Sequence, residues 1–340
     1  MTTAVQPARP DSFVHGPSAG HFSSYIVAVA LSAACELGIL DVLADEGAYR
    51  LDRDDRELDP VVVERLLNGL VWGDVVRVAD GVARPGPGFA DAYAARGYFY
   101  WMVRGCGALF SEAPRVARRD QRDGAFYRRD MRAVAVGSHL IADTAVEGLY
   151  DALLAEREFG ALADLGCGSG RRLTRVAGGR PGVRGIGVDI APAAVKLAAR
   201  SIEDAGLADR ITVCEADVLD LPAIPGGERV DVITCSFMGH DFWPYDRCVR
   251  TLRGLRRAFP NAGRFLLCDV ARATRRPGPD TPLFTLGFEL VHALMGVYLP
   301  TRDEWFAAFA ASGWRCVAAH DVTAPPGGVM FDLEPVAAHG

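Results

Sequence analysis

The stretch Ala161–Gly170, which has the sequence ALADLGCGSG, decides the fold of this chain. Its first half is apolar and indicates a short buried strand, while its second half is a turn that is rich in glycine. Glycine lets a backbone turn tightly and lets a ligand approach the main chain closely. The next segment, 171–177, has a helical pattern, so the sequence predicts a strand, a turn and a helix in that order.

Two further predicted strands are each followed by an acidic residue. The segment 184–188 leads into Asp189, which lies about 20 residues after the turn, the separation at which a carboxylate can bind the hydroxyls of a ribose. The segment 211–214 is followed closely by Asp217 and Val218. Because the carboxyl ends of parallel strands meet at one edge of a sheet, this edge is expected to bind a nucleotide-like cofactor.

The glycine spacing distinguishes between two cofactors. A dinucleotide site has the pattern G-x-G-x-x-G, whereas this turn has G-x-G-x-G preceded by an acid. The turn resembles motif I of the class I S-adenosylmethionine (SAM) methyltransferases, which implies that Asp189 holds the ribose and that Asp217 with Val218 contacts the adenine. An NAD site and an ordinary strand, turn and helix are the alternatives. The predicted SAM-binding residues are Asp164, Gly166, Gly168, Gly170, Asp189, Asp217, Val218 and Phe237.

Composition restricts the class of protein. The chain has 340 residues, of which 50% are hydrophobic, enough for a large core and two domains. A net charge of −6 argues against a nucleic-acid partner, because a phosphate backbone attracts a basic surface. The eight cysteines contain no C-x-x-C pair, which indicates a reducing cytoplasm without disulfides. By sequence, no apolar run reaches the length needed to span a bilayer, and no signal pattern is visible, so we expect a cytoplasmic protein without a membrane partner.

Strand and helix patterns alternate from residue 159 to the end of the chain, which predicts an α/β fold with a doubly wound sheet of seven strands. The part before it is mostly helical, with an apolar stripe over 21–45, a helix over 60–70 and a short hairpin near 74–84, a winged-helix-like pattern. The predicted organisation is a disordered tail over 1–20, a helical domain over 21–155 and a SAM-binding domain over 156–340.

This two-domain arrangement resembles the small-molecule methyltransferases of secondary metabolism. In that family the amino-terminal domain forms an intertwined dimer and closes over the substrate. The resemblance therefore implies a homodimer and a small-molecule substrate.

A second candidate site follows the predicted strand 230–237 and has the sequence MGHDFWP, residues 238–244. In the O-methyltransferases a His-Asp pair at this place carries the catalytic base. Histidine suits this role, because its unperturbed pKa lies near the working pH. The resemblance implies that His240 removes a proton from a hydroxyl and that Asp241 orients His240.

The rest of the carboxyl half strongly resembles the bacterial α-keto acid C-methyltransferases. The segments that carry this resemblance include FLLCDV, residues 265–270, and LFTLGFELVHALMGVYLPT, residues 283–301. The family holds a metal ion with two histidines, which match His240 and His292, and the metal binds the carboxylate and 2-keto oxygen of the substrate. The segments FYWMVRGCGALF and GAFYRRDMRA resemble the same family, in which Trp101 and Arg129 match substrate-pocket residues.

The chemistry of the reaction agrees with this resemblance. A carbon beside a ketone is a poor acid, and a metal on the keto oxygen stabilises its enolate. Arginine suits a carboxylate because its fork binds both oxygens, and Phe288 is a candidate for the apolar wall of the pocket. Imidazole binds both iron and zinc, so the sequence does not decide which of the two metals is bound. Water, substrate or a carboxylate could complete its shell. The candidate carboxylates are Asp241, Asp269 and Glu289.

The sequence therefore predicts a metal-dependent SAM C-methyltransferase that acts on the β-carbon of a 2-oxo acid. Phenylpyruvate and 4-methyl-2-oxovalerate represent the two substrate types that the family implies, and the product would be a precursor of a β-methyl amino acid for a peptide natural product. One alternative is a metal-free phenolic O-methyltransferase with His240 as base. Another is an inactive SAM-binding scaffold that dimerises through its amino-terminal domain.

Overall fold

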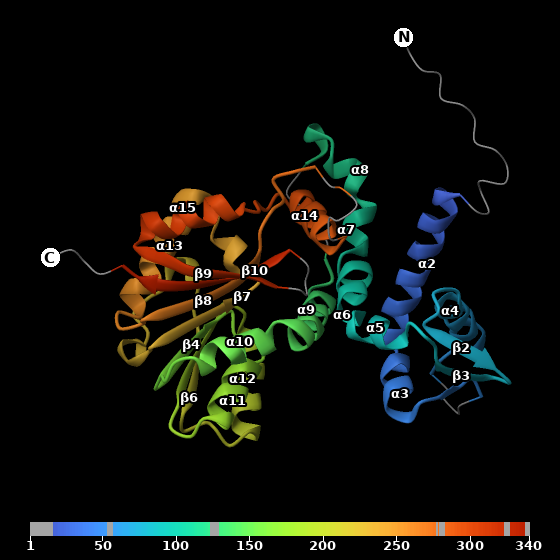
Figure 1. The fold of residues 1–340 in the computed structure, drawn as a ribbon, viewed down its shortest axis with the longest axis horizontal. Helices are drawn as coiled ribbons and strands as arrows, with labels where there is room; N and C mark the ends of the chain where they lie inside the picture. Colours follow the sequence, from blue (N-terminus) through green and yellow to red (C-terminus); the bar gives the residue numbers. More distant parts are fainter. Residues whose placement is uncertain are drawn as a thin grey trace, which may run out of the picture. The chain divides into compact units, whose positions relative to one another are not determined.

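The computed structural model describes residues 16–52, 57–122, 129–276, 278, 283–322 and 327–336. The predicted tail over residues 1–20 lies mostly outside these residues. The chain divides into two compact units, Met1–Ala142 and Asp143–Gly340 (Figure 1).

The first unit begins with helices and a small sheet. Asp59 caps α4 by accepting hydrogen bonds from the main-chain N–H groups of the first turn, and Pro60 is the first helical residue, where no amide donor is needed. Gly38 has a φ of +69° and separates α2 from α3, so the apolar stripe over 21–45 forms two helices and not one. The elements are α2 Pro17–Glu36, α3 Ile39–Glu46, β1 Tyr49–Arg50, α4 Pro60–Trp72, β2 Val76–Ala79 and β3 Val82–Pro85, with sheet order β1-β3-β2.

The expectation that no segment is long enough to span a bilayer is wrong for helix α2. The helix has 20 residues and is apolar enough to cross a membrane by length and composition alone. Core helices of water-soluble proteins also pass this test, and the carboxyl half of α2 buries Ala30, Leu31 and Ala34 in the core of the first unit.

The second half of the first unit is a series of short helices. The sequence pattern predicts long helical segments over 89–115 and 124–155, but the chain contains a π-helix, η1 Tyr100–Gly105, that packs tightly on α9. A Cβ on Gly137 of α9 would lie 2.7 Å from the Cβ of Trp101, so this crossing requires glycine. The other elements are α5 Phe89–Ala94, α6 Arg96–Phe99, α7 Gly107–Ser111, α8 Ala113–Val116, η2 Arg119–Gln121 and α9 Met131–Ala145.

The second unit contains the predicted sheet of seven strands. Its order is β6-β5-β4-β7-β8-β10-β9, and β10 pairs antiparallel with both of its neighbours while the other pairs are parallel. The strands are β4 Ala161–Leu165, β5 Arg184–Asp189, β6 Ile211–Glu215, β7 Val232–Ser236, β8 Arg264–Val270, β9 Trp314–Val322 and β10 Gly328–Pro335.

Helices cover both faces of this sheet (Figure 1). Alternate residues of β4 point to opposite faces, so Leu162 packs with α10, α11 and α12, whereas Ala163 packs with α13 and α15. This arrangement confirms the predicted doubly wound α/β fold. The helices are α10 Glu147–Ala155, α11 Arg171–Gly179, α12 Pro192–Asp204, α13 Tyr245–Ala258, α14 Leu283–Met295 and α15 Arg302–Ser312; short helical turns are η3 Val218–Asp220, η4 Gly227–Arg229 and η5 Gly239–Phe242.

The division between the units lies before α10, whereas the sequence suggests a boundary after residue 155. The physical reason is the apolar face of α10. Tyr150, Leu153 and Leu154 are buried in the same core cluster as Leu162 of β4. Helix α10 therefore belongs to the sheet.

Candidate active site

The glycine-rich loop between β4 and α11 has the backbone geometry that its sequence predicts. Gly166, Gly168 and Gly170 have φ angles of +66°, +54° and +72°, values that side chains with a Cβ rarely adopt. A Cβ on Gly166 would lie 2.9 Å from the sulfur of Met238, which adds a steric reason for glycine. A Cβ on Gly168 would meet no protein atom within 4 Å, so open space adjoins the loop there.

Asp189 at the end of β5 contacts the same loop. Its Oδ2 accepts a hydrogen bond of 2.9 Å from the Gly168 N–H, and its Oδ1 accepts one of 2.9 Å from the Ala191 N–H. Each carboxylate oxygen keeps further acceptor capacity, so the fixed carboxylate suits the two hydroxyls of a ribose. The adjacent Ile190 is 64% exposed and forms an apolar surface that the sequence did not single out.

Two more predicted cofactor residues follow the neighbouring strand β6. Asp217 is exposed and caps the short helix η3 by accepting a hydrogen bond from the Leu219 N–H, and Val218 beside it is buried. Phe237 follows β7 with a φ of +49°, which is unusual for a bulky residue and marks a strained turn at the carboxyl edge of the sheet. The parallel strands β4, β5, β6 and β7 thus end at one edge with the predicted cofactor residues.

Asp164 of β4 is held by groups that the sequence did not single out. It is 2% exposed, and its Oδ1 accepts hydrogen bonds of 2.7 Å from Arg172 and 2.7 Å from Thr234. Burial raises the pKa of Asp164, while the guanidinium of Arg172 opposes this rise. Arg172 lies two residues after the glycine loop, where a buried arginine gives no periodic signal in the sequence.

His240 is oriented by Asp269. The Nδ1 of His240 lies 2.9 Å from Oδ1 of Asp269, and the main-chain N–H of His240 donates to Oδ2 at 2.7 Å. Asp269 is fully buried in β8. A carboxylate accepts hydrogen bonds, so Nδ1 carries the ring proton and Nε2 carries the lone pair. Gly239 permits this approach, because a Cβ there would lie 2.9 Å from the same carboxylate.

Asp269 therefore orients the His240 ring, and not Asp241 as the resemblance implied. His240 and Asp241 are consecutive residues of η5, a helix with three residues per turn, and their side chains diverge. Asp241 is exposed, and none of the described residues pairs with its carboxylate. Sequence spacing could not identify Asp269, because it lies 29 residues away from His240 on the neighbouring strand.

His292 of α14 lies against His240. The ring centres are 4.7 Å apart and the ring planes are almost perpendicular, at 85°. His292 donates from Nδ1 to the carbonyl oxygen of Phe288 at 2.7 Å, which leaves the lone pair on Nε2. The ring of Phe288 packs on His292 at 4.0 Å and on the edge of His240 at 5.6 Å. The predicted histidine pair and Phe288 thus form one buried cluster.

The candidate carboxylate ligands have other contacts or lie exposed. Asp269 orients His240, and Glu289 accepts a hydrogen bond of 2.6 Å from the Ala273 N–H. Within the described ranges of the chain, no group of three or more His, Cys, Asp or Glu residues is arranged to hold a metal. The donor set that fits a metal is therefore limited to the two imidazoles, each with its Nδ1 proton bound by an acceptor, a pattern typical of metal-binding histidine.

Trp101 and Arg129 belong to the first unit. Trp101 is 4% exposed within η1, and Arg129 is half-buried beside the start of α9. Burial raises the pKa of the Cys106 thiol to about 12, and the positive charge of Arg129 partly opposes this rise.

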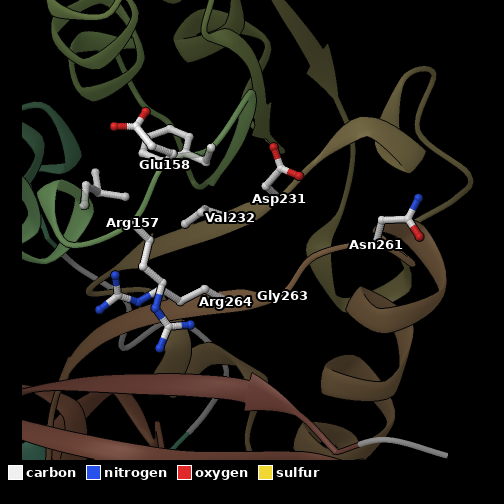
Figure 2. A pocket seen from close by; sticks show the side chains of 9 residues that line it. Arg157, Glu158, Asp231, Val232, Asn261, Gly263 and Arg264 are labelled. Atoms are coloured by element: carbon white, nitrogen blue, oxygen red, sulfur yellow. The ribbon is translucent and has the colours of Figure 1, made fainter.

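A separate pocket lies at the opposite edge of the sheet, where β7 and β8 begin (Figure 2). Its volume is about 190 Å³. Asp231 in its wall accepts hydrogen bonds from the N–H groups of Gly160 and Ala161, and Arg264 is paired with Asp332. The pocket lies at the amino ends of these strands, and none of its lining residues belongs to the glycine loop.

Comparison with known proteins agrees with the fold and the glycine loop. Residues 162–263 match the methyltransferase domain family. The human N-acetylserotonin methyltransferase, solved in complex with SAM, has a similar fold, with a TM-score of 0.69 and 18% identity over 98% of this chain and 100% of that one. The chain belongs to the class I SAM-dependent methyltransferases, which have this seven-stranded sheet and bind SAM.

Several proteins are similar to this chain in sequence, and three of them follow. The chain is 38% identical over 330 residues to the methyltransferase ungE' of Aspergillus campestris, covering 94% of this chain and 96% of that protein. It is 31% identical over 183 residues to an indolepyruvate C-methyltransferase of Streptomyces griseus, covering 54% and 53% of the two chains. It is also 31% identical over 158 residues to a phenazine O-methyltransferase of Lysobacter antibioticus, covering 46% and 43%.

Proposed function

We propose that this enzyme transfers the methyl group of SAM to the β-carbon of a 2-oxo acid, making a precursor of a β-methyl amino acid. The observation that carries this proposal is the buried pair His240 and His292, with ring centres 4.7 Å apart and both Nδ1 atoms anchored. An O-methyltransferase needs one base here and leaves the second imidazole without a task. Similarity to an indolepyruvate C-methyltransferase supports this substrate class.

The histidine pair fits one iron or zinc ion. Both Nε2 atoms carry lone pairs, and imidazole suits either metal. When bound, the metal would act as a Lewis acid that stabilises negative charge on the keto oxygen. Asp269 and Glu289 are engaged elsewhere, so we propose that water and substrate oxygens complete the shell.

The other residues bind and orient the 2-oxo acid in this proposal. Arg129 binds the carboxylate through its planar fork. Trp101 and Phe288 form apolar contacts with the side chain of the substrate, and the exposed carboxylate of Asp241 is a further substrate contact. Methyl transfer then requires the β-carbon in line with the sulfonium methyl at about 3 Å.

A second candidate function is O-methylation of a phenol, which the contact between His240 and Asp269 favours. A buried carboxylate on Nδ1 makes Nε2 a better proton acceptor, as a general base requires. The phenazine O-methyltransferase relative supports this alternative. An inactive SAM-binding scaffold is the third possibility.

Two measurements on the purified protein distinguish these functions. The first is metal analysis of the parent and of His240→Ala, His292→Ala and His320→Ala, the last being a control histidine on β9. The second is exchange of substrate β-hydrogens with deuterated water in the absence of SAM. We expect one metal per chain and β-carbon exchange in the parent and the control, and loss of both in the first two variants.

Turnover with labelled SAM completes the test. A panel of aryl and branched aliphatic 2-oxo acids should give labelled product. A metal-free His292→Ala protein that still methylates a phenol would establish the O-methyltransferase instead. SAM binding without turnover on any 2-oxo acid or phenol would support the third possibility, an inactive SAM-binding scaffold.

We also propose that the protein is a homodimer formed by its first unit. Large apolar side chains are exposed on α2 and α4, where Phe22 is 70%, Tyr25 63% and Trp72 73% exposed. Burial of such a surface is favourable, and a second copy of the chain would provide a matching apolar surface.

A further inference from the structure

The buried arginine Arg172 joins the acid of the glycine loop to helix α10. Its Nη1 donates to Oδ1 of Asp164 at 2.7 Å, and its Nη2 donates to Glu147 at 2.6 Å and to Ser236 at 2.8 Å. The guanidinium carbon lies 4.0 Å from the centre of the Tyr150 ring. The side chain is 8% exposed, so its charge is compensated almost entirely by protein groups.

The two oxygens of Asp164 have different surroundings. Oδ1 accepts from Arg172 and Thr234, whereas no described residue donates a hydrogen bond to Oδ2. Oδ2 is not among the fully buried side-chain atoms that lack a partner, so it keeps some exposure and can accept a hydrogen bond from a ligand. Asp164 stands directly before the loop that binds SAM, and the amino-acid part of SAM carries an ammonium group that can donate to such an oxygen.

We infer that Arg172 is a positioning residue for the cofactor, which holds Asp164 ionised through Oδ1 so that Oδ2 receives the ammonium group of SAM. Glu147 contributes by fixing the opposite side of the guanidinium, together with Arg175, which pairs with both Glu147 and Asp151. Arg172 thereby acts on SAM through Asp164 and not by direct contact.

The groups around Asp164 identify Arg172 as the cation that keeps it charged. Burial raises the pKa of Asp164, and Arg172 lowers it. Glu147 on α10 raises it further, because its negative charge is close. Tyr150 and the thiols of Cys167 and Cys235 have raised pKa values and remain neutral near pH 7. Without Arg172, the pKa of Asp164 would rise, and the carboxyl group would become protonated as the pH falls toward the acidic range.

Binding of two cofactor analogues to the full-length protein tests this inference. S-adenosylhomocysteine has the ammonium group, whereas methylthioadenosine lacks the amino-acid part. For Arg172→Met, we expect affinity for S-adenosylhomocysteine to fall by about tenfold at pH 6 and to recover toward pH 8, because the protonated carboxyl group attracts the ammonium group less than the carboxylate does. Affinity for methylthioadenosine should stay at the parent value. Arg172→Lys, which keeps the charge, should show little pH dependence.

Two further variants control for folding. Arg264→Met removes another buried arginine of the same unit, which pairs with Asp332 far from the loop, and should leave affinity for both analogues unchanged. Asp164→Asn preserves shape and should weaken binding of S-adenosylhomocysteine alone, at all pH values, even if Arg172→Met does not fold. Equal loss of both analogues in Arg172→Met, or parental binding by Asp164→Asn, would overturn the inference.

Discussion

His240 donates its Nδ1 proton to Asp269 across 2.9 Å, and the same carboxylate accepts the main-chain N–H of His240. This two-point contact fixes both the position and the tautomer of the imidazole. It directs the lone pair of Nε2 away from β8, whether that lone pair binds a metal or a proton. The contact joins the ends of two neighbouring strands, so the sheet itself determines the position of the His240 imidazole.

The first prediction concerns this contact. Asp269→Asn removes the negative charge but keeps the shape, so His240 should lose its fixed tautomer and its basicity. We expect methyl transfer to fall by about 10- to 100-fold, with cofactor affinity retained. Asp246→Asn is the matched control, because Asp246 is exposed on α13 and does not orient His240. Steady-state turnover of both variants checks the prediction, and a larger loss in Asp246→Asn would contradict it.

The second prediction concerns the ribose contact. Asp189→Ala removes the acceptor beside Gly168, and we expect cofactor affinity to fall by about tenfold or more, since hydrogen bonds to a charged group contribute roughly 1.5–3 kcal/mol. Calorimetric titration with S-adenosylhomocysteine measures this loss. The midpoint of thermal unfolding should change little, because the Asp189 carboxylate accepts only two main-chain hydrogen bonds, from Gly168 and Ala191.

The third prediction concerns the open space at Gly168. Its Cβ would contact no protein atom, so Gly168→Val should fill the volume that the cofactor needs and abolish binding. The positive φ of +54° adds backbone strain of about 1–2 kcal/mol. Gly206→Val is the control, because Gly206 has a φ of +67°, has equal open space and lies in a turn after α12. Similar cofactor affinity in both variants would mean that the loop is not the cofactor site.

The fourth prediction concerns Arg129. Replacement by lysine keeps the charge but loses the planar fork, so we expect KM for the 2-oxo acid to rise by about tenfold while cofactor affinity is unchanged. Arg132→Lys serves as control, because Arg132 is mostly exposed and pairs with Glu36. Kinetics across a range of 2-oxo acid concentrations provide the measurement. A parental KM in Arg129→Lys argues against this carboxylate contact.

The fifth prediction concerns the proposed dimer. Introducing charge on the exposed stripe, as in Tyr25→Glu, should convert a dimer into a monomer in sedimentation at micromolar concentration, because a charge resists burial. Val317→Glu, at a 41% exposed site on β9, should leave the dimer intact. A parent protein that sediments as a monomer would refute the proposal.

Local sequence predicted the glycine loop and the acidic residues at the strand ends, which the structure places at one edge of the sheet. The residues that contribute to this edge lie within a few positions of a strand end, and the positive φ angles of Gly166 and Gly168 follow from their spacing in the loop. The lengths of the strands and most helices also followed from local apolar patterns. The π-helix at Trp101 was the exception, because it packs closely on Gly137 of a helix that is distant in the sequence.

The sequence by itself determined the sheet, the glycine loop and the acids at the strand ends, because each is a pattern of neighbouring residues. Only the tertiary structure decided which groups meet across elements. It paired His240 with Asp269 instead of Asp241, brought His292 against His240, and buried Arg172 between Asp164 and Glu147. Such contacts depend on strand order and helix packing, which bring together residues that are far apart in the chain and carry no common spacing.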